Sequence, residues 1–370
     1  MSQFEKVEIQ DFGLWEKVKA GRALMSFDLE LTARCNNNCR HCYINLPAND
    51  RDARAKELTL AEINHIADQA VELGAVWCLL TGGEPLLRED FADIYLSLKR
   101  KGLFLAVFTN ATVIRAEHIA LFKKYPPRDI EVTVYGSCRE SYERVTRKAG
   151  SFAAFQVGLD ALIEAGIKVR LKAMALRSNL EDMEQIAVFS RERTKDYYRF
   201  DPQLHLRYDL DPRRNAEIMV ERLTPDEYVA LERADTERFG ALQKNCDVFI
   251  DERFRDAEGG YLFRCGAGVS SFTVGYDGTY RLCSALHAPG TTANLREVSL
   301  RQAWEGLSPQ VRAIRSTNPT YLESCQRCPI TNLCMHCPAH AHLESRAMDG
   351  ETPYFCALAH ARASAIRGQD

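Results

Sequence analysis

The feature of this sequence that most constrains its fold is an alternation of short apolar runs with longer helical patterns between Leu24 and about Tyr208. Such an alternation is typical of a parallel α/β architecture. Because strand-helix-strand connections are right-handed, two topologies stay open: an open doubly wound sheet, or a full or partial (β/α) barrel. Six runs have strand character, and they cover residues 24–32, 76–83, 103–110, 130–136, 168–176 and 197–208.

Helices are predicted between these strands. The first is the best defined, since Thr59 can cap it and Glu62 completes a capping box. Apolar residues then recur on one helical face from Ile63 to Val71. Four further helical patterns cover residues 89–101, 116–124, 151–165 and 180–194.

The chain changes character after Tyr208, and this change predicts a division into four parts. Residues beyond it are charged and helical, with Thr224 and Pro225 as the cap and first turn of a helix, so we interpret them as a bridge. From Cys246 onward the chain is rich in cysteines and turns, with a tight hairpin around Asp277-Gly278. The parts are an N-terminal segment, an α/β domain, the bridge and a Cys-rich domain, at residues 1–23, 24–210, 211–245 and 246–370.

Composition and charge narrow the functional classes. The 48 Lys and Arg against 51 Asp and Glu give a net charge of -3, so no global basic field draws the protein to nucleic acid or to an anionic membrane. The first residues lack the apolar stretch of a signal peptide, and no apolar run reaches the roughly 18 residues that span a bilayer. We therefore expect a cytoplasmic protein without nucleic-acid or membrane partners. In a reducing compartment, 13 cysteines at short spacings indicate metal ligands before disulfides.

Three of these cysteines, Cys35, Cys39 and Cys42, lie within eight residues, directly after the first predicted strand. Ligands bind at that end of the strands in α/β folds. Soft thiolates suit zinc or iron-sulfur clusters, and a structural zinc site closes with four ligands at shorter, paired spacings. A [4Fe–4S] cluster held by three thiolates leaves one iron open to bind a substrate or cofactor. The alternative, three buried cysteines by chance, fits poorly with the polar residues between them.

Two motifs together resemble those of the radical S-adenosylmethionine (radical SAM) enzymes. "CNNNCRHCY" is similar to the three-cysteine signature of that family, with Tyr43 as the aromatic residue that follows it. "TGGEP" at 81–85 resembles the glycine-rich motif that holds the methionine amino group of SAM. The resemblance covers residues 24–210. It implies a partial (β/α)6 TIM-like barrel and a [4Fe–4S] cluster on Cys35, Cys39 and Cys42.

The same resemblance implies the residues that contact SAM. Glycines at 82 and 83 permit close backbone approach, and Glu84 can accept a hydrogen bond from an amine. "FTNAT" is similar to the end of the third strand in related enzymes, although Ala111 stands where Gly is usual. The implied cofactor-binding residues are Tyr43, Gly82, Gly83, Glu84, Pro85, Asn110, Thr133 and Arg144.

The C-terminal cysteines resemble the SPASM extension of radical SAM enzymes that mature peptides and proteins, a module with two auxiliary [4Fe–4S] clusters. The implied outer ligands are Cys325, Cys328, Cys334 and Cys356. The implied inner ligands are Cys265, Cys283 and Cys337, with either Cys246 or an open iron completing the set. Two residues separate Cys334 from Cys337, where the module usually has three. A zinc ribbon is the alternative, but seven cysteines are too many for one zinc.

The implied activity is reductive cleavage of SAM, which yields a radical that abstracts hydrogen from the substrate. A C-terminal Cys-rich two-cluster SPASM domain favours oxidative crosslinking of a ribosomally synthesised peptide, with electrons from an external donor such as flavodoxin or ferredoxin. Anaerobic sulfatase maturases, small-metabolite enzymes and a non-catalytic electron carrier are the alternatives. Sulfatase maturases carry Asp where this chain has Ser284, and a carrier has no use for "TGGEP". Polar residues after the last predicted strand either face the substrate opening or form a solvated linker: Arg207, Asp209, Asp211 and Arg213.

Overall fold

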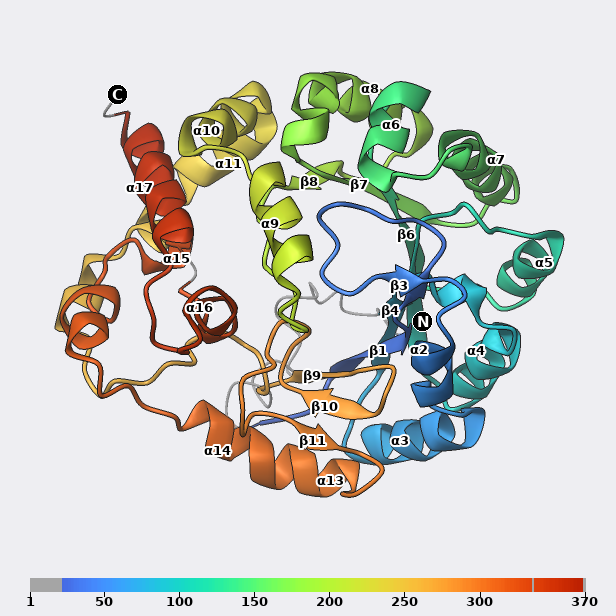
Figure 1. Cartoon of the computed structure of the whole chain (residues 1–370), viewed down its shortest axis with the longest axis horizontal. Helices are drawn as coiled ribbons and strands as arrows, with labels where there is room; N and C mark the ends of the chain where they lie inside the picture. The colour runs from blue at the N-terminus through green and yellow to red at the C-terminus, as the bar shows by residue number, and fades with distance from the viewer. Residues whose placement is uncertain (1–21, 335, 369–370) are drawn as a thin grey trace, which may run out of the picture.

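The computed structural model describes residues 22–334 and 336–368. Most of the predicted N-terminal segment, residues 1–21, therefore lies outside the described residues. Six parallel strands form the centre of a curved sheet, and helices lie around its outer side (Figure 1). This architecture confirms the predicted partial (β/α)6 barrel and decides between the topologies that periodicity left open.

The strands of the main sheet occur in the order β11-β10-β9-β1-β4-β5-β6-β7-β8, and β2 and β3 form a separate pair. Their bounds are β1 Ser26–Thr32, β2 Arg34–Cys35, β3 Leu46–Pro47, β4 Trp77–Gly82, β5 Phe104–Thr109, β6 Asp129–Val134, β7 Val169–Met174, β8 Arg199–Asp201, β9 Ser271–Val274, β10 Thr279–Arg281 and β11 Ala293–Asn294.

Helices connect the parallel strands and build most of the C-terminal half. Those of the α/β part are α2 Arg51–Lys56, α3 Leu60–Glu72, α4 Phe91–Arg100, α5 Ala116–Lys124, α6 Arg139–Thr146, α7 Ser151–Glu164 and α8 Met183–Arg193. The others are α9 Pro212–Glu221, α10 Pro225–Ala234, α11 Thr236–Lys244, α12 Cys246–Phe249, α13 Leu300–Gln302, α14 Ser308–Arg312, α15 Thr331–Cys334, α16 Pro338–Ser345 and α17 Pro353–Arg367.

Local sequence signals account for the helix starts. The predicted capping box is present, because the Thr59 backbone N–H donates to the Glu62 carboxylate at 2.7 Å and the Glu62 N–H donates to the Thr59 hydroxyl at 3.2 Å. Thr224 caps α10 in the same way, with Pro225 in the first turn. Both helices therefore begin where the sequence predicts.

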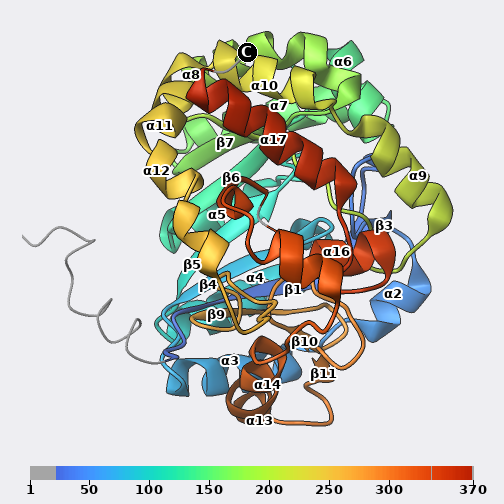
Figure 2. The same cartoon turned by 90° about the vertical axis from the view of Figure 1, so that its left-hand side faces the viewer.

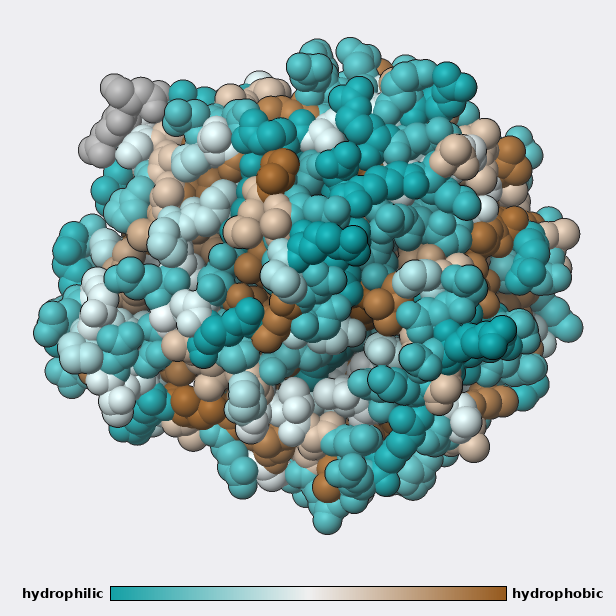
Figure 3. Space-filling model, in the orientation of Figure 1, coloured by the Kyte–Doolittle hydropathy of each residue, from teal (hydrophilic) through white to brown (hydrophobic). Residues whose placement is uncertain are grey.

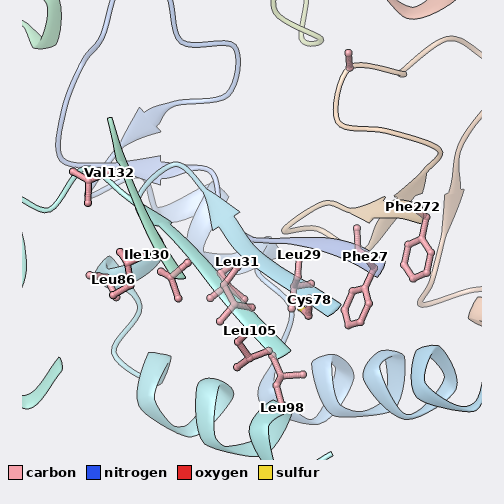
Figure 4. Packing of buried hydrophobic residues seen from close by; sticks show 14 of the residues in the cluster. Phe27, Leu29, Leu31, Cys78, Leu86, Leu98, Leu105, Ile130, Val132 and Phe272 are labelled. Atoms are coloured by element: carbon pink, nitrogen blue, oxygen red, sulfur yellow. The ribbon is translucent and has the colours of Figure 1, made fainter. Parts of the chain in front are cut away.

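The side chains of β1 alternate between the two sides of the sheet. Phe27, Leu29 and Leu31 are buried against the helical layer that includes α3 and α4 (Figure 4). Asp28 and Glu30 point the other way and line a cavity inside the barrel. Cys78 on β4 is buried in the hydrophobic core, as predicted.

The main sheet continues from the barrel into the Cys-rich region. Strand β9 pairs in parallel with β1, opposing Phe272 to Phe27, and β10 and β11 extend the sheet as antiparallel strands. The rings of Phe27 and Phe272 stack with centroids 5.5 Å apart. The predicted hairpin around Asp277-Gly278 is thus the turn between β9 and β10. One sheet crosses the predicted boundary between domains.

Two elements of the structure differ from the sequence prediction. The sixth strand covers only Arg199–Asp201, because Pro202 has no N–H for the ladder and the chain continues as a loop that reaches the cavity. Residues Arg139–Thr146 form helix α6, which is not among the helices expected from the sequence.

The C-terminal elements close the open side of the barrel. Figures 1 and 2 show α16 and α17 beside α9 and α10, across the interior from the helices that cover the parallel strands. The face in Figure 3 is mostly hydrophilic, with small scattered hydrophobic groups. None of the helices in the described ranges is long and apolar enough to cross a membrane.

Candidate active site

A cavity of about 390 Å³ lies inside the barrel, at the carboxyl ends of the parallel strands. It brings together eight of the residues predicted to bind a cluster or cofactor: Cys35, Cys39, Cys42, Tyr43, Gly82, Gly83, Asn110 and Thr133. The Cys-rich region contributes Thr273 and Ser284 to the same wall. Both parts of the chain therefore build one site.

Three groups from elsewhere in the chain hold the loop with the first three cysteines. The carbonyl of Thr146 at the end of α6 accepts from the Asn38 N–H at 2.9 Å. Arg214 donates to the Cys39 carbonyl at 3.0 Å, and Arg207 donates to the Cys42 carbonyl at 3.2 Å. The loop is thus fixed on both sides of its cysteines.

The position of Arg207 fits neither of the two alternatives left open for it. Its guanidinium is buried against the cysteine loop and pairs with Asp209, so it does not face a substrate opening. Asp211 caps α9 by accepting from the backbone N–H groups of Arg213 and Arg214. Nothing in the sequence pattern singles out Arg214.

The thiols of this loop fit a cluster held by three ligands. Burial raises the pKa of Cys35 to about 12, with Glu84 and Cys42 adding to the effect, and burial also raises the pKa of Cys39 well above its usual value. Buried thiolates close to one another need a compensating cation, which iron supplies. Within residues 22–334 and 336–368, no three His, Cys, Asp or Glu side chains lie close enough to hold a single metal ion.

The two glycines are required by the packing of β4 against β1. A Cβ on Gly83 would lie 2.3 Å from the Arg34 carbonyl oxygen, and one on Gly82 would lie 2.3 Å from that of Thr32. Gly82 also has a φ of +126°. The Gly83 N–H donates to the Thr32 carbonyl at 2.7 Å. Their first role is to let the two strand ends meet at the cavity wall.

Glu84 lies behind the cavity wall. Its carboxylate is fully buried and accepts from the Thr109 hydroxyl and the Asn110 N–H, both at 2.8 Å, and from the Leu86 N–H at 3.1 Å. Burial raises its pKa to about 7. Glu84 and Pro85 are both buried away from the cavity wall. These hydrogen bonds tie the ends of β4 and β5 together, and the contact of Glu84 with SAM stays a prediction.

The other implied cofactor contacts divide into two groups. Asn110 and Thr133 line the cavity, and the Asn110 amide lies 3.7 Å from the Cys35 sulfur. Ala111 has a φ of 60°, a left-handed conformation that explains why Gly is usual there. Arg144, in contrast, is exposed on α6 and donates to the Ser178 carbonyl at 3.2 Å. The helix turns it away from the cavity, so the prediction for Arg144 is not supported.

A charged group on the inner face of β1 also belongs to the site. Glu30 accepts from Arg281 on β10 at 2.5 Å, and the Arg281 guanidinium lies 2.6 Å from the His287 ring nitrogen. Burial, with the nearby Glu30, raises the pKa of Asp28 to about 6. The alternation of acidic and apolar residues in the first strand is the signal that could have indicated these residues.

The second set of cysteines surrounds another cavity. All four predicted outer ligands line a space of about 520 Å³ between the 321–334 segment and α17: Cys325, Cys328, Cys334 and Cys356. Burial raises the pKa of Cys334 to about 12, and the neighbouring Cys356 and Cys328 add to this effect. Four convergent thiols of this kind fit the ligand set of a complete cluster.

The predicted inner ligands are also neighbours. Burial raises the pKa of Cys337 to about 12, with contributions from Cys283 and Cys265. Cys246 lies elsewhere: it packs in the hydrophobic cluster that includes Cys328 and Cys334. The structure therefore does not bring Cys246 to the inner set, which leaves three described thiols there.

A row of aromatic rings connects the cavity with the second set of cysteines. Tyr43 contacts His205 at a centroid distance of 4.7 Å, His205 stacks on His340 at 5.4 Å, and His340 stacks on Phe355 at 5.0 Å. Burial lowers the pKa of His340 to about 3, so this ring is neutral. The row packs the loop after β8 against α16 and α17.

Comparison with known protein families gives two matches. Residues 29–189 match the Radical SAM superfamily, and residues 265–329 match SPASM, an iron-sulfur cluster-binding domain. The chain is 24% identical over 349 residues to the AdoMet-dependent heme synthase of Methanosarcina barkeri, covering 88% of this chain and 94% of that protein. It is 24% identical over 321 residues to the antilisterial bacteriocin subtilosin biosynthesis protein AlbA of Bacillus subtilis, covering 83% of this chain and 66% of AlbA.

Among solved structures, the fold is similar to that of Streptococcus suis SuiB. The structure of SuiB bound to S-adenosylmethionine has a TM-score of 0.66 at 15% sequence identity, covering 92% of this chain and 80% of SuiB. The structure of SuiB bound to the precursor peptide SuiA gives the same TM-score and identity. The likeness in fold covers both the barrel and the Cys-rich region.

Proposed function

Because this chain is an enzyme of the radical SAM superfamily with a C-terminal SPASM domain, we propose that it modifies a ribosomally synthesised peptide by oxidative crosslinking. Its cofactors are [4Fe–4S] clusters and S-adenosylmethionine. When bound, they supply a 5′-deoxyadenosyl radical that abstracts hydrogen from the substrate.

The cysteines would hold the clusters, and one wall of the cavity would bind SAM. The first cluster would be held by Cys35, Cys39 and Cys42, with Arg207 and Arg214 fixing that loop. SAM would lie along the wall that carries Tyr43, Gly82, Gly83, Asn110 and Thr133. The auxiliary clusters would be held by an outer and an inner set: Cys325, Cys328, Cys334 and Cys356, and Cys265, Cys283 and Cys337.

The observation that carries the proposal is the shared cavity. Thr273 and Ser284 of the Cys-rich region line it together with the cysteine loop and the glycine pair of the barrel. A substrate in this cavity would contact both parts of the chain. The peptide class is supported by the name of AlbA, a bacteriocin biosynthesis protein, and by the SuiB structure with a precursor peptide.

A second candidate is the modification of a small metabolite, because the M. barkeri relative is a heme synthase that this chain covers almost completely. Sulfatase-maturase-like protein modification is less favoured. The position of its acidic base is Ser284 here, and this residue presents a hydroxyl to the cavity.

The experiment uses anaerobically reconstituted protein with dithionite, SAM and a short peptide encoded beside the gene. We expect 5′-deoxyadenosine and a peptide mass loss of about two hydrogens per crosslink, since oxidation removes them from the joined atoms. A Cys35→Ala, Cys39→Ala, Cys42→Ala variant should yield neither product. Cys138→Ala is the matched control, because this exposed cysteine lines neither described cavity.

Two results would contradict the proposal. Undiminished 5′-deoxyadenosine from the triple variant would remove the assignment of the first cluster. A metabolite that changes mass while the peptide does not would favour the second candidate. Replacing dithionite with reduced flavodoxin or ferredoxin tests the proposed external electron donor, and product should still form.

A further inference from the structure

We propose that Asp28 and Glu30 form an anionic subsite that binds a cationic side chain of the substrate, an ammonium or a guanidinium group. The inference rests on the proposed function, since it takes the substrate to be a peptide. It adds a chemical requirement that the peptide must meet.

The geometry of β1 presents both carboxylates to one space. Asp28 and Glu30 are alternate residues of the strand, so their side chains lie on the same side of the sheet, and both line the main cavity. Glu30 is 1% exposed, and its Oε2 atom accepts from Arg281. Its Oε1 atom is buried and has no hydrogen-bond partner among the described residues. A buried, unpaired carboxylate oxygen beside a cavity indicates a missing donor.

The charge of this wall is negative. Two carboxylates face one guanidinium, that of Arg281. His287 adds no positive charge, because arginine can only donate and the imidazole nitrogen must therefore accept from it. Burial lowers the pKa of His287 to about 3. Thr273, which faces Asp28 from β9, is neutral.

The cation on the opposite wall is already paired. Lys172 lies 2.6 Å from the Glu131 carboxylate, which also binds Arg199 at 2.6 Å. Arg199 shares that carboxylate but is half-exposed, so solvent screens its charge, and the β1 wall itself keeps the net charge of one carboxylate for a ligand. An incoming ammonium or guanidinium would supply the donors that these oxygens lack.

The position of Asp28 favours the substrate over SAM as the ligand of the subsite. Thr32 pairs with Gly82, and Asp28 lies four residues from Thr32, roughly 13 Å along the strand, whereas Glu30 pairs with Thr81 and lies roughly 7 Å from Thr32. Asp28 instead opposes Thr273 of the Cys-rich region. SAM also carries an ammonium group, so the test must distinguish these two sources.

The test compares two probes on the reconstituted wild-type holoprotein: Nα-acetyl-lysine methylamide, and the uncharged Nα-acetyl-norleucine methylamide of similar shape. Dissociation constants are measured anaerobically by ligand-observed NMR, with and without saturating SAM. We expect the lysine probe to bind at least about tenfold more tightly, with SAM leaving its affinity unchanged. Equal affinities for the two probes, or displacement of the lysine probe by SAM, would overturn the proposal.

Asp28→Asn tests the residue assignment, because it keeps the shape and removes the charge. We expect the preference for the lysine probe to fall to within about twofold, while Glu89→Gln, an exposed carboxylate with 82% of its side chain accessible, retains it. An unchanged preference in Asp28→Asn would also overturn the proposal. If this variant does not fold, the affinities of the two probes for the wild-type protein still decide whether the subsite prefers a cation.

These outcomes separate the subsite from the proposed function. If the lysine probe is preferred but no peptide changes mass under turnover, the subsite stands and the crosslinking proposal fails. If a peptide is crosslinked but the two probes bind equally, the proposed function stands and the subsite fails.

Discussion

The carboxylate of Asp28 works against the stability of the fold. Burial, with the nearby Glu30, raises its pKa from the ordinary value of 3.8, which applies to the unfolded chain, to about 6 in the folded protein. The contribution of the protonated side chain to stability is therefore fully present below pH 3.8 and is lost as pH rises through about 6. We predict that Asp28→Asn increases the free energy of unfolding by about 1.4 kcal/mol more at pH 8 than at pH 5. Denaturant titrations of the reconstituted protein at both pH values measure this difference. Glu89→Gln should show no such difference, and the same absence in Asp28→Asn would contradict the prediction.

Arg207 makes several of the hydrogen bonds that hold the cysteine loop. Besides the Cys42 carbonyl, it donates to the backbone carbonyl and side chain of Asn45 at 3.3 Å and 3.2 Å. Replacing it with Gln removes this donor from the Cys42 and Asn45 carbonyls, while Arg214 still donates to the Asn45 side chain at 3.0 Å. We predict a loss of about 3 kcal/mol in the free energy of unfolding. Arg213→Gln, at an exposed position in α9, is the matched control.

The same variant should also change the iron content. Three intact clusters give about 12 irons per chain, and a disordered first loop should leave about 8. Iron analysis and visible spectra after anaerobic reconstitution measure this. A full complement of iron in Arg207→Gln would show that the hydrogen bonds of Arg207 are not needed to hold the first cluster. Stoichiometric zinc at the outer cysteines would instead restore the zinc-ribbon alternative.

At the residue scale, the sequence predicts what short motifs encode. The first three cysteines and the glycine pair can be predicted from local spacing, and the structure places them at one cavity: Cys35, Cys39, Cys42, Gly82 and Gly83. The roles of Arg207, Glu84 and Asp28 cannot be read in this way. Each depends on contacts with residues far along the chain, such as the 165 positions between Arg207 and Cys42.

At the scale of elements, the approach of the end of β4 to the residues that follow β1 is tightly constrained. A methyl group on Gly83 would meet backbone oxygens of Ala33 and Arg34, which no rotamer change can move. We predict that Gly83→Ala lowers the free energy of unfolding by about 3 kcal/mol. Gly240 in α11 has open space around its Cα, so Gly240→Ala should be neutral or stabilise by up to about 1 kcal/mol. Equal effects of the two variants in denaturant titrations would contradict this account.

Local signals predict most elements, and tertiary context decides the exceptions. The helix that begins after Thr59 follows its capping box, and α5 has the predicted bounds of 116–124. The segment 197–208 has strand composition throughout, yet only Arg199–Asp201 finds a partner, on β7. In its remainder, Leu204 and Leu206 pack in a separate hydrophobic cluster, a contact that no local pattern reveals.

For the whole molecule, the continuous sheet argues against two independently stable halves. Strand β1 lies between β4 of the barrel and β9 of the Cys-rich region, so each half covers an edge of the other. The composition change after Tyr208 correctly indicates a different kind of region. It cannot show that the later strands return to β1, because strand pairing over more than 200 residues leaves no mark in local sequence.

The stacked pair Phe27 and Phe272 tests this coupling between the halves. Phe272 is 1% exposed and also packs on Tyr280 and Trp304. We predict that Phe272→Ala lowers the free energy of unfolding by about 4 kcal/mol. We also expect a single transition, followed equally by far-ultraviolet circular dichroism and by the visible absorption of the clusters, since neither half can unfold while the shared sheet persists. Phe104→Ala, at a site that is 58% exposed, should change stability by no more than about 0.5 kcal/mol. Two separate transitions in Phe272→Ala, with the clusters lost before the helices melt, would show that the halves are independent.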